Sequence, residues 1–209
     1  MARPKGSRNR DYERKRADLA LRASSYMVRE DGSPSTLAEL ANAAGVSIPT
    51  LRNYFADRDG VIEAALATRA HTHLVSLDDE SSLDGVEVAR SLTAFLHGFI
   101  NRWRELGVGE EFSIALQLGM RNPQLGNAAV DHVFEPVLAS AQRRLAVHHD
   151  RGDLAKGINL RVAAFALLSP VIVSLIHQDQ LSGNETRPFD VWTFVEEHVD
   201  RFVRGYANV

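Results

Sequence analysis

The chain has 209 residues, of which 44% are hydrophobic and 24% are charged. These fractions are close to the average of globular proteins, so they exclude a wholly disordered or fibrous protein. The chain contains no cysteine, which excludes a disulfide scaffold, a thiol nucleophile and a thiolate metal site, and favours a cytoplasmic location. The length allows one domain or two small ones, and we expect two.

The formal charge of −3 is unevenly distributed along the chain. Residues 1–60 hold 11 Lys and Arg against 8 Asp and Glu, whereas the remainder holds 13 against 19. The first 16 residues carry seven basic and two acidic side chains, a cluster that can neutralise phosphates and displace their counterions. The alternative is a solvated, disordered tail.

No segment has the pattern of a secretory signal or of a membrane span. The basic N-terminus is followed by no apolar stretch. The most apolar run, residues 162–176, is interrupted by Ser169 and Pro170 and is shorter than the roughly 18 residues that a bilayer span requires. We interpret it as a buried helix and expect no membrane partner.

The pattern predicts two helices before residue 45. Small and apolar residues recur at three- and four-residue spacing from Ala20 to Val28, which predicts a first helix that ends near Gly32. After a breaker cluster at residues 33–35, Thr36 and Glu39 form the capping-box signature that starts a second helix.

A tight turn is expected between the second helix and a third. Gly45 follows Ala44, and glycine tolerates the left-handed conformation that ends a helix and reverses the chain. Ser47 is positioned as the N-cap of the third helix, and Pro49 lies in its first turn, where a missing N–H costs nothing. Two short helices joined by a glycine turn, after a longer helix, form a trihelical helix-turn-helix unit.

The segment LAELANAAGVSIPTLRNYFADRDGVIEAAL resembles the DNA-binding signature of the TetR family of transcriptional regulators. The matching positions are Leu40, Ala41, Ala44, Gly45, Val46, Ser47, Pro49, Thr50, Leu51, Tyr54, Phe55 and Arg58. The chain departs from the signature at Arg52, where the family usually has an aromatic residue, and at Ser33, which replaces a bulky apolar residue. The resemblance covers about residues 15–70 and beyond them depends on length and helical pattern.

We therefore expect an all-α protein in which an N-terminal three-helix helix-turn-helix DNA-binding domain precedes a larger C-terminal helical domain for ligand binding and dimerisation. The expected boundaries are a flexible basic arm over residues 1–10, the DNA-binding domain over 11–56, a connecting helix over 57–76, and the sensing and dimerisation domain over 77–209.

The DNA contacts are predicted from the way a recognition helix enters the major groove by its N-terminal half. Arg52 is suited to a guanine, Asn53 to an adenine, and Ile48 or Pro49 to a thymine methyl group. The resemblance implies phosphate contacts for two further side chains, and the basic arm is expected along the adjacent minor groove. The complete predicted set is Thr36, Ser47, Ile48, Pro49, Thr50, Arg52, Asn53, Tyr54, Arg58, Arg3, Lys5, Arg8 and Arg10.

Within that set, Tyr54 and Arg58 are the phosphate contacts that the resemblance implies. Thr36 has two interpretations, a phosphate contact and a cap that never meets DNA. Leu51 is expected to face inward as core.

The remainder of the chain also has a helical pattern, and no strand is predicted. Asp57 is the expected N-cap of a fourth helix that runs to about Val75. A long amphipathic helix is predicted over residues 88–103. Further helices are predicted over residues 110–120, 123–147, 159–177 and 190–206.

Specific binding to a palindromic operator requires two helix-turn-helix units related by a two-fold axis, so a homodimer is expected. Residues 160–176 are apolar on nearly every side, which suggests burial against a partner as well as within the subunit. The resemblance implies a four-helix interface from the last two helices; the alternative is that both fill the core of one subunit. The stripe expected on the last helix is Val191, Val195, His198, Val199, Phe202 and Tyr206.

The resemblance also implies a small-molecule effector that binds among the middle helices, shifts the fourth helix and releases the operator, with repression as the family default. An apolar or aromatic effector is expected; the alternative for each candidate side chain is that it is ordinary core, as aromatic residues at helical spacing usually are. The candidate pocket residues are Phe95, Phe99, Trp103, Phe112, Leu116, Met120, Phe134, Leu138 and Phe165.

The sequence offers three alternatives to a regulator: a metal protein, an enzyme and an architectural protein. His148, His149 and Asp150 invite a metal site, but adjacent histidines do not face the same way on a helix and no HExxH motif is present, so neither a metal nor a cofactor is expected. No GxSxG, Walker or GxGxxG motif supports an enzyme. A sequence-nonspecific architectural or partner-binding helical protein is the remaining alternative.

Overall fold

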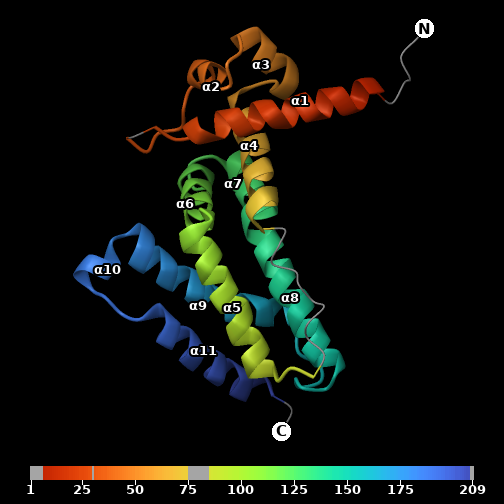
Figure 1. Cartoon of the computed structure of the whole chain (residues 1–209), viewed down its shortest axis with the longest axis vertical. Coiled ribbons are helices and arrows are strands. Elements are labelled where there is room, and N and C mark those ends of the chain that lie inside the picture. The colour runs from red at the N-terminus through yellow and green to blue at the C-terminus, as the bar shows by residue number, and fades with distance from the viewer. Residues whose placement is uncertain (1–6, 30, 75–84, 208–209) are drawn as a thin grey trace. The chain divides into compact units, whose positions relative to one another are not determined.

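The computed structural model describes residues 7–29, 31–74 and 85–207, with the side chains of 10–29, 31–70 and 85–207. These residues are mostly helical and contain no β-strand, so the predicted all-α fold is confirmed (Figure 1). They form two compact units. The first comprises the described residues up to Thr72 together with Ile114–Val133, and the second comprises the described residues of His73–Ser113 and Phe134–Val209.

The first unit contains the predicted helix-turn-helix. Helix α1 packs on α2, and α2 packs on α3. Its core includes Leu19, Leu40, Leu51 and Ile62, none of which exposes more than 1% of its surface. The helices of this unit are α1 Ser7–Ala23, α2 Leu37–Ala43, α3 Ile48–Phe55, most of α4 Arg58–Leu74, the second half of α6 Val108–Gly119, and α7 Pro123–Ala129.

Helix α1 ends earlier than the sequence pattern predicts. It stops at Ala23 and is followed by a 3₁₀ turn, Ser24–Tyr26. The hydroxyl of Ser24 donates to the Leu21 carbonyl at 2.6 Å, and such local bonds compete with the helical ladder. Val28 instead forms a single β-bridge to Pro34, so the apolar residues near this end pack without being helical.

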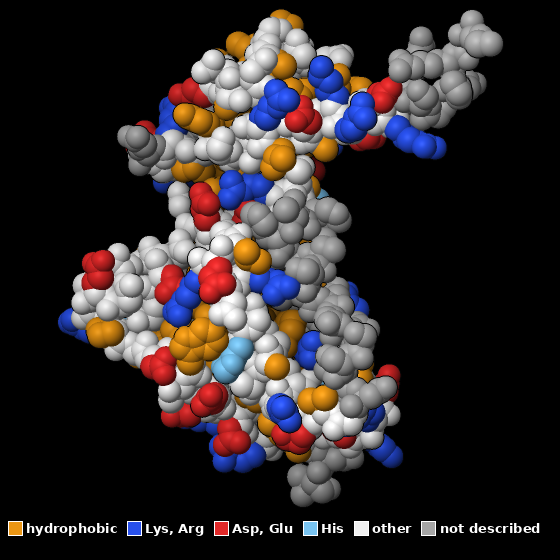
Figure 2. Space-filling view, in the orientation of Figure 1, with side chains coloured by type: hydrophobic (Ala, Val, Ile, Leu, Met, Phe, Trp, Pro, Cys, Tyr) orange, Lys and Arg blue, Asp and Glu red, His pale blue; other side chains and the backbone are white. Residues whose placement is uncertain are grey.

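The flexible arm predicted over residues 1–10 overlaps the start of α1. Helix α1 begins at Ser7, so Arg8 and Arg10 are helical, whereas Arg3 and Lys5 lie outside the described residues. The first turns are rich in charged residues with straight side chains, which favour helices, and Arg14 forms an ion pair with Asp11 one turn away. Figure 2 shows Lys and Arg side chains, with Asp and Glu between them, along α1.

The second unit is a helical bundle. Helix α8 packs along α9, α11 packs on α5 and α9, and α5 also contacts α8 and α9. All seven apolar residues that define the predicted amphipathic helix at 88–103 are buried on α5. The helices of this unit are α5 Val88–Glu105, the first half of α6, α8 Glu135–Asp150, α9 Leu160–Leu175, α10 Gly183–Thr186 and α11 Val191–Tyr206.

Two predicted helices contain π-helical turns. The helix expected over residues 123–147 consists of α7, the π-turn Val130–Phe134 and α8, and α9 continues into a second π-turn, Ile176–Gln180. In the second turn the buried Gln178 side chain donates to the Arg187 carbonyl at 3.1 Å and accepts from the Phe189 N–H at 3.2 Å. Gln178 thereby holds the loop that contains the short helix α10, which the sequence did not predict.

Candidate nucleic-acid interface

The turn between α2 and α3 has the geometry that the sequence predicts. Gly45 adopts φ +69°, its N–H donates to the Asn42 carbonyl at 3.0 Å, and the Val46 N–H donates to the Ala41 carbonyl at 3.0 Å. These two bonds form a Schellman motif. They end α2 abruptly and direct the chain into α3.

The N-terminus of α3 is capped as predicted. The Ser47 Oγ accepts a hydrogen bond from the Thr50 N–H at 3.3 Å and lies 2.8 Å from the Thr50 hydroxyl. Pro49 occupies the first turn, where it displaces no helical hydrogen bond. The start of the helix is therefore stabilised by residues of the helix itself and its N-cap.

Helix α3 has one buried face and one exposed face. Leu51 is fully buried and Phe55 is 6% exposed, so they anchor the helix in the core. On the other side Ser47, Ile48, Pro49, Arg52 and Asn53 are exposed, and Thr50 is half-buried. In the part of the chain that the structure describes, the Arg52 and Asn53 side chains have no hydrogen-bond partner, so their donors face solvent.

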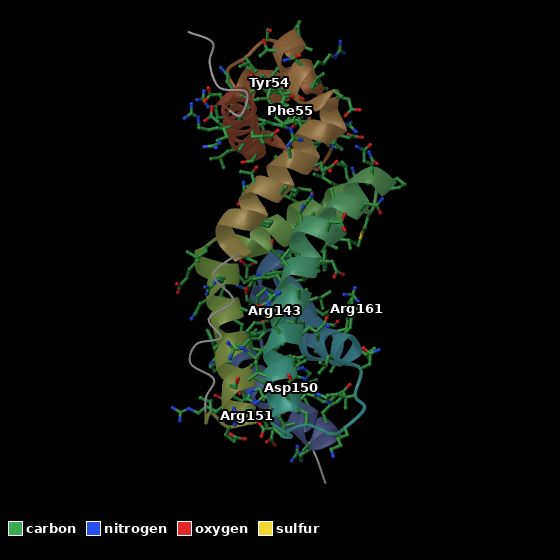
Figure 3. The ribbon with its side chains drawn as sticks, turned by 90° about the vertical axis from the view of Figure 1, so that its right-hand side faces the viewer. Tyr54, Phe55, Arg143, Asp150, Arg151 and Arg161 are labelled. Carbon is green, nitrogen blue, oxygen red and sulfur yellow. The ribbon has the colours of Figure 1, made fainter. Side chains whose placement is uncertain are left out.

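Helix α1 supports the C-terminal end of α3 through contacts that the sequence did not reveal. The rings of Tyr12 and Tyr54 stack with centroids 4.8 Å apart, and the Tyr12 hydroxyl donates to the Asn53 carbonyl at 3.3 Å. Arg16 Nε donates to the Tyr54 carbonyl at 3.3 Å, and its guanidinium lies 5.1 Å from the centre of the Phe55 ring. Figure 3 shows Tyr54 and Phe55 at this junction. A cation here also complements the negative end of the helix dipole.

The corner between α3 and α4 is tightly constrained. Ala56 adopts φ 65° and ψ −58°, and the Asp57 N–H donates to the Phe55 carbonyl at 2.8 Å, which is the rare and strained form of γ-turn. The Asp57 carboxylate caps α4 by accepting from the Gly60 N–H at 2.9 Å, as predicted. A Cβ at Gly60 would overlap the Phe55 carbonyl oxygen.

Arg58 directly follows this corner. Its side chain is 38% exposed and forms an ion pair with Asp59, with Nε 2.7 Å and Nη2 2.6 Å from Oδ1. The other oxygen of Asp59 accepts a 2.6 Å hydrogen bond from the amide of Asn122, which is also the N-cap of α7. The turn between α6 and α7 is thus bonded to the start of α4.

The start of α2 has the predicted capping box. The Thr36 hydroxyl donates to Glu39 Oε2 at 2.7 Å and accepts from the Glu39 N–H, while the Thr36 N–H donates to the same carboxylate oxygen at 2.7 Å. Arg29 adds a bidentate ion pair with Glu39, with contacts from 2.8 to 3.1 Å. The Arg29 guanidinium and the Thr36 donors lower the pKa of Glu39 to about 2. The exposed Thr36 therefore serves as a cap, and its contact with DNA stays a prediction.

The residues proposed for an effector pocket are only partly brought together. The rings of Phe99, Trp103, Phe112 and Phe134 form one aromatic cluster in the second unit, with neighbouring centroids 4.9 to 6.2 Å apart. Phe95 and Leu138 are buried in the same unit. The pocket itself stays a prediction.

Three other candidates lie outside this cluster. Met120 is 81% exposed and follows the end of α6, and Phe165 is 43% exposed on the outer side of α9; for these two a place in a pocket stays a prediction. Leu116 belongs to the first unit.

The outer face of α9 is apolar and exposed. Val162, Phe165 and Val173 each expose 43% to 63% of their surface, whereas the opposite face, which includes Leu167, Leu168 and Val171, is buried. The helix and the π-turn after it, Leu160–Gln180, have the length and composition of a membrane span: an 18-residue window within them has mean hydropathy 1.9, and 39% of that window is buried. The helix is thus longer than the sequence pattern indicated, but core helices of soluble proteins also meet this criterion.

The stripe predicted on α11 lies mostly inside the subunit. Four of its six residues are buried and fill the core of the second unit: Val191, Val195, Val199 and Phe202. This agrees with the alternative interpretation, in which the last two helices fill the core of one subunit. His198 and Tyr206 are half-buried, and His198 Nε2 lies 2.9 Å from the Leu167 carbonyl, which ties α11 to α9.

The two histidines that suggested a metal site lie beside two different carboxylates. His148 is fully buried, and its Nδ1 lies 2.9 Å from Asp153 Oδ2, whereas His149 lies beside Asp150. The described residues contain no group of three or more His, Asp or Glu side chains that could hold a metal ion.

Several solved structures with a similar fold are those of regulators. One from Mesorhizobium loti, assigned to the TetR family of transcriptional regulators, is 18% identical, with a TM-score of 0.76 over 94% of this chain and 98% of that chain. The flavonoid-responsive regulator FrrA is 17% identical, with a TM-score of 0.71 over 92% and 97%. The complex of SmeT with triclosan is 19% identical, with a TM-score of 0.65 over 93% and 92%; SmeT is the repressor of a multidrug efflux pump of Stenotrophomonas maltophilia. No family model and no curated protein matches the sequence. The chain thus has the TetR-family fold that its sequence motif indicated.

Proposed function

From this TetR-family fold we propose that the chain is a ligand-responsive, DNA-binding transcriptional regulator of the cytoplasm, acting as a homodimer and as a repressor on a palindromic operator. The observation that carries the proposal is the exposed N-terminal face of α3, which is anchored by the buried Leu51 and Phe55. A capped helix with polar and apolar side chains on its outer face, after a Schellman turn, is suited to the major groove.

The base contacts come from the exposed face of α3. The Arg52 guanidinium is suited to the O6 and N7 of guanine, and the Asn53 amide to the N6 and N7 of adenine. Ile48 and Pro49 offer apolar surface to a thymine methyl group. The hydroxyls of Ser47 and Thr50 are close enough to share one phosphate or base partner.

The phosphate contacts surround this face. Tyr54 is held by its stack on Tyr12, and Arg58 by its ion pair with Asp59. Thr36 supplies an exposed N-terminus of α2. Arg8 and Arg10 lie in the first turn of α1, and Arg3 and Lys5 precede it in the chain. Each of the Arg and Lys side chains in this set neutralises a phosphate and displaces a counterion.

Dimerisation brings two such helices to one duplex. The exposed Val162, Phe165 and Val173 of α9 form an apolar face, and such a face on a soluble protein marks an interaction surface. A second copy of the chain covers it, with α11 contributing its half-buried His198 and Tyr206. The dimer places the DNA-binding domains, residues 11–56, on two half-sites.

The effector is a small apolar or aromatic molecule. The aromatic cluster around Trp103 and Phe112 lies in the unit that follows the DNA-binding helices, and edge-to-face ring packing of this kind suits an aromatic guest. The structural relatives FrrA and SmeT, by their names, respond to a flavonoid or bind triclosan. The neighbours are regulators and not enzymes, so no catalytic role is proposed.

Selection of duplexes from random DNA at one fixed salt concentration tests the proposal. The expected result is enrichment of an inverted repeat by the wild-type protein, and loss of the enriched DNA on addition of one compound from a panel of apolar and aromatic molecules. Binding without any enriched sequence would favour the architectural alternative and contradict the regulator.

A further inference from the structure

The start of α4 is bonded to the turn between α6 and α7 through one carboxylate. Asp59 accepts the Arg58 guanidinium on Oδ1, at 2.6 to 2.7 Å, and the Asn122 amide on Oδ2, at 2.6 Å. The Asp59 side chain is only 19% exposed, so most of its surface is covered by protein. All three residues belong to the first unit.

The backbone around Arg58 is already fixed by the chain itself. The γ-turn at Ala56, the Asp57 cap and the close approach of Gly60 to the Phe55 carbonyl leave the corner little freedom. What remains variable is the direction of the long Arg58 side chain. Because Nε and Nη2 both bond to Asp59, that carboxylate sets the direction of the guanidinium.

Asn122 in turn sets the position of the carboxylate. Its Nδ2 donates to Asp59 while its Oδ1 accepts from the Gln124 N–H at 2.9 Å as the N-cap of α7, so the amide is fixed at both ends. A second contact, from Arg121 Nη1 to the Gly32 carbonyl at 3.3 Å, attaches the same turn to the loop before α2. The α6–α7 turn is therefore held against the DNA-binding helices at two places.

The negative charge of Asp59 affects the phosphate contact proposed for Arg58. A carboxylate next to a phosphate-binding arginine repels the phosphate unless donors hold it and share its charge. Asn122 supplies such a donor to the oxygen that Arg58 does not use. The guanidinium has five N–H donors in a fixed plane, so those that do not face Asp59 remain for a phosphate.

We infer that Asn122 is a positioning residue for the DNA contact of Arg58, acting through Asp59 from the α6–α7 turn. The inference rests on the proposed function, because it takes Arg58 as a phosphate contact. Any shift of the turn that breaks the bond between Asn122 and Asp59 weakens DNA binding without a change in α3. The strength of DNA binding is thereby linked to residues 121–122.

The test compares Asn122→Asp with the wild-type protein on one duplex enriched by the wild type, over a range of salt concentrations. Asp keeps the capping oxygen for α7 but replaces the donor by a charge that repels Asp59. The expected result is about a tenfold loss of affinity with a salt slope lower by about one. Asn159→Asp is the matched control, because Asn159 caps α9 in the same manner and lies in the other unit; it should bind like the wild type.

The same substitution in an Arg58→Ala background separates positioning from general damage. If Asn122 acts through Arg58, Asn122→Asp adds no further loss there and leaves the slope of that background unchanged. An equal loss in both backgrounds, or wild-type binding by Asn122→Asp where Arg58→Ala is weakened, would overturn the inference alone. Wild-type affinity and slope for Arg58→Ala would instead show that the phosphate contact itself is wrong, and the inference would fall with it.

Discussion

Arg52 projects from the exposed face of α3 in the first two turns of the helix. If it reads a guanine, Arg52→Ala should lose preference at one base position of the selected site and weaken binding there by about 1–3 kcal/mol. Affinities for the selected duplex and for its single-base variants measure the change. A loss of the same size on every sequence would assign Arg52 to a phosphate instead.

Glu39 makes stability depend on acid pH. Its pKa in the folded protein is about 2, against an ordinary value of 4.5, chiefly because of the Arg29 hydrogen bonds. A pKa that is lower in the folded state means that the unfolded chain takes up the proton more readily. The stabilisation is thus complete above about pH 4.5 and is lost as the pH falls toward about 2.

Glu39→Gln tests this dependence, because Gln retains the capping box and does not titrate. Thermal melts of the two proteins between about pH 5 and about pH 2.5 should show a steeper fall for the wild type. Parallel melting curves over that interval would show that the ion pair with Arg29 contributes nothing to stability.

The sequence indicates the role of a residue in the candidate site only where that role depends on its neighbours in the chain. Ser47, Gly45 and Thr36 were predicted correctly because caps and turns depend on neighbours within a few positions. Tyr12, Arg16 and Asn122 were missed because their partners, Asn53, Tyr54 and Asp59, are distant in sequence. No periodicity or motif marks such contacts, which arise only when the helices pack.

At the scale of elements, Gly60 fixes the angle between α3 and α4. Because a Cβ there would overlap the Phe55 carbonyl, Gly60→Ala should destabilise the protein by about 1–3 kcal/mol. Gly98→Ala in α5 is the control, since its Cβ meets no described atom within 4 Å, and it should stabilise by roughly 0.5–1 kcal/mol. Denaturant titrations give both values, and equal effects would contradict the close approach.

Helix positions were predictable and helix ends were less so. The buried face of α5 follows directly from its 3.6-residue period. The end of α1 at Ala23 and the π-turns within the two longest predicted helices were missed, because they depend on side-chain bonds and on tertiary packing that periodicity does not encode. Helix α10 is held by the buried Gln178, again a contact within the folded unit.

In the whole molecule, the sequence indicated two domains but did not indicate which residues belong to each compact unit. Ile114–Val133 belongs to the same compact unit as the helix-turn-helix, although the sequence pattern placed it in the predicted sensing domain. Within this unit Arg121 bonds to Gly32 and Asn122 bonds to Asp59, and the two residues of each pair are far apart in the chain. Chain order alone does not reveal such an arrangement.

A substitution on the exposed face of α9 tests the proposed dimerisation. Val173, 63% exposed on α9, lies on the proposed interface, so Val173→Glu should yield a monomer because a buried charge opposes association. Met120→Glu, at an exposed position outside that face, should leave the mass unchanged. Sedimentation equilibrium measures both, and a dimeric Val173→Glu protein would exclude α9 from the interface.

Sequence-specific DNA binding through α3 is tested most directly by competition between two duplexes of the same composition, the selected inverted repeat and a shuffled sequence. Both are measured at one salt concentration near the physiological value. We expect the wild-type protein to prefer the selected duplex by a factor on the order of 10³ or more, and Arg52→Ala to lower this ratio. Equal affinity for the two duplexes would contradict sequence-specific binding.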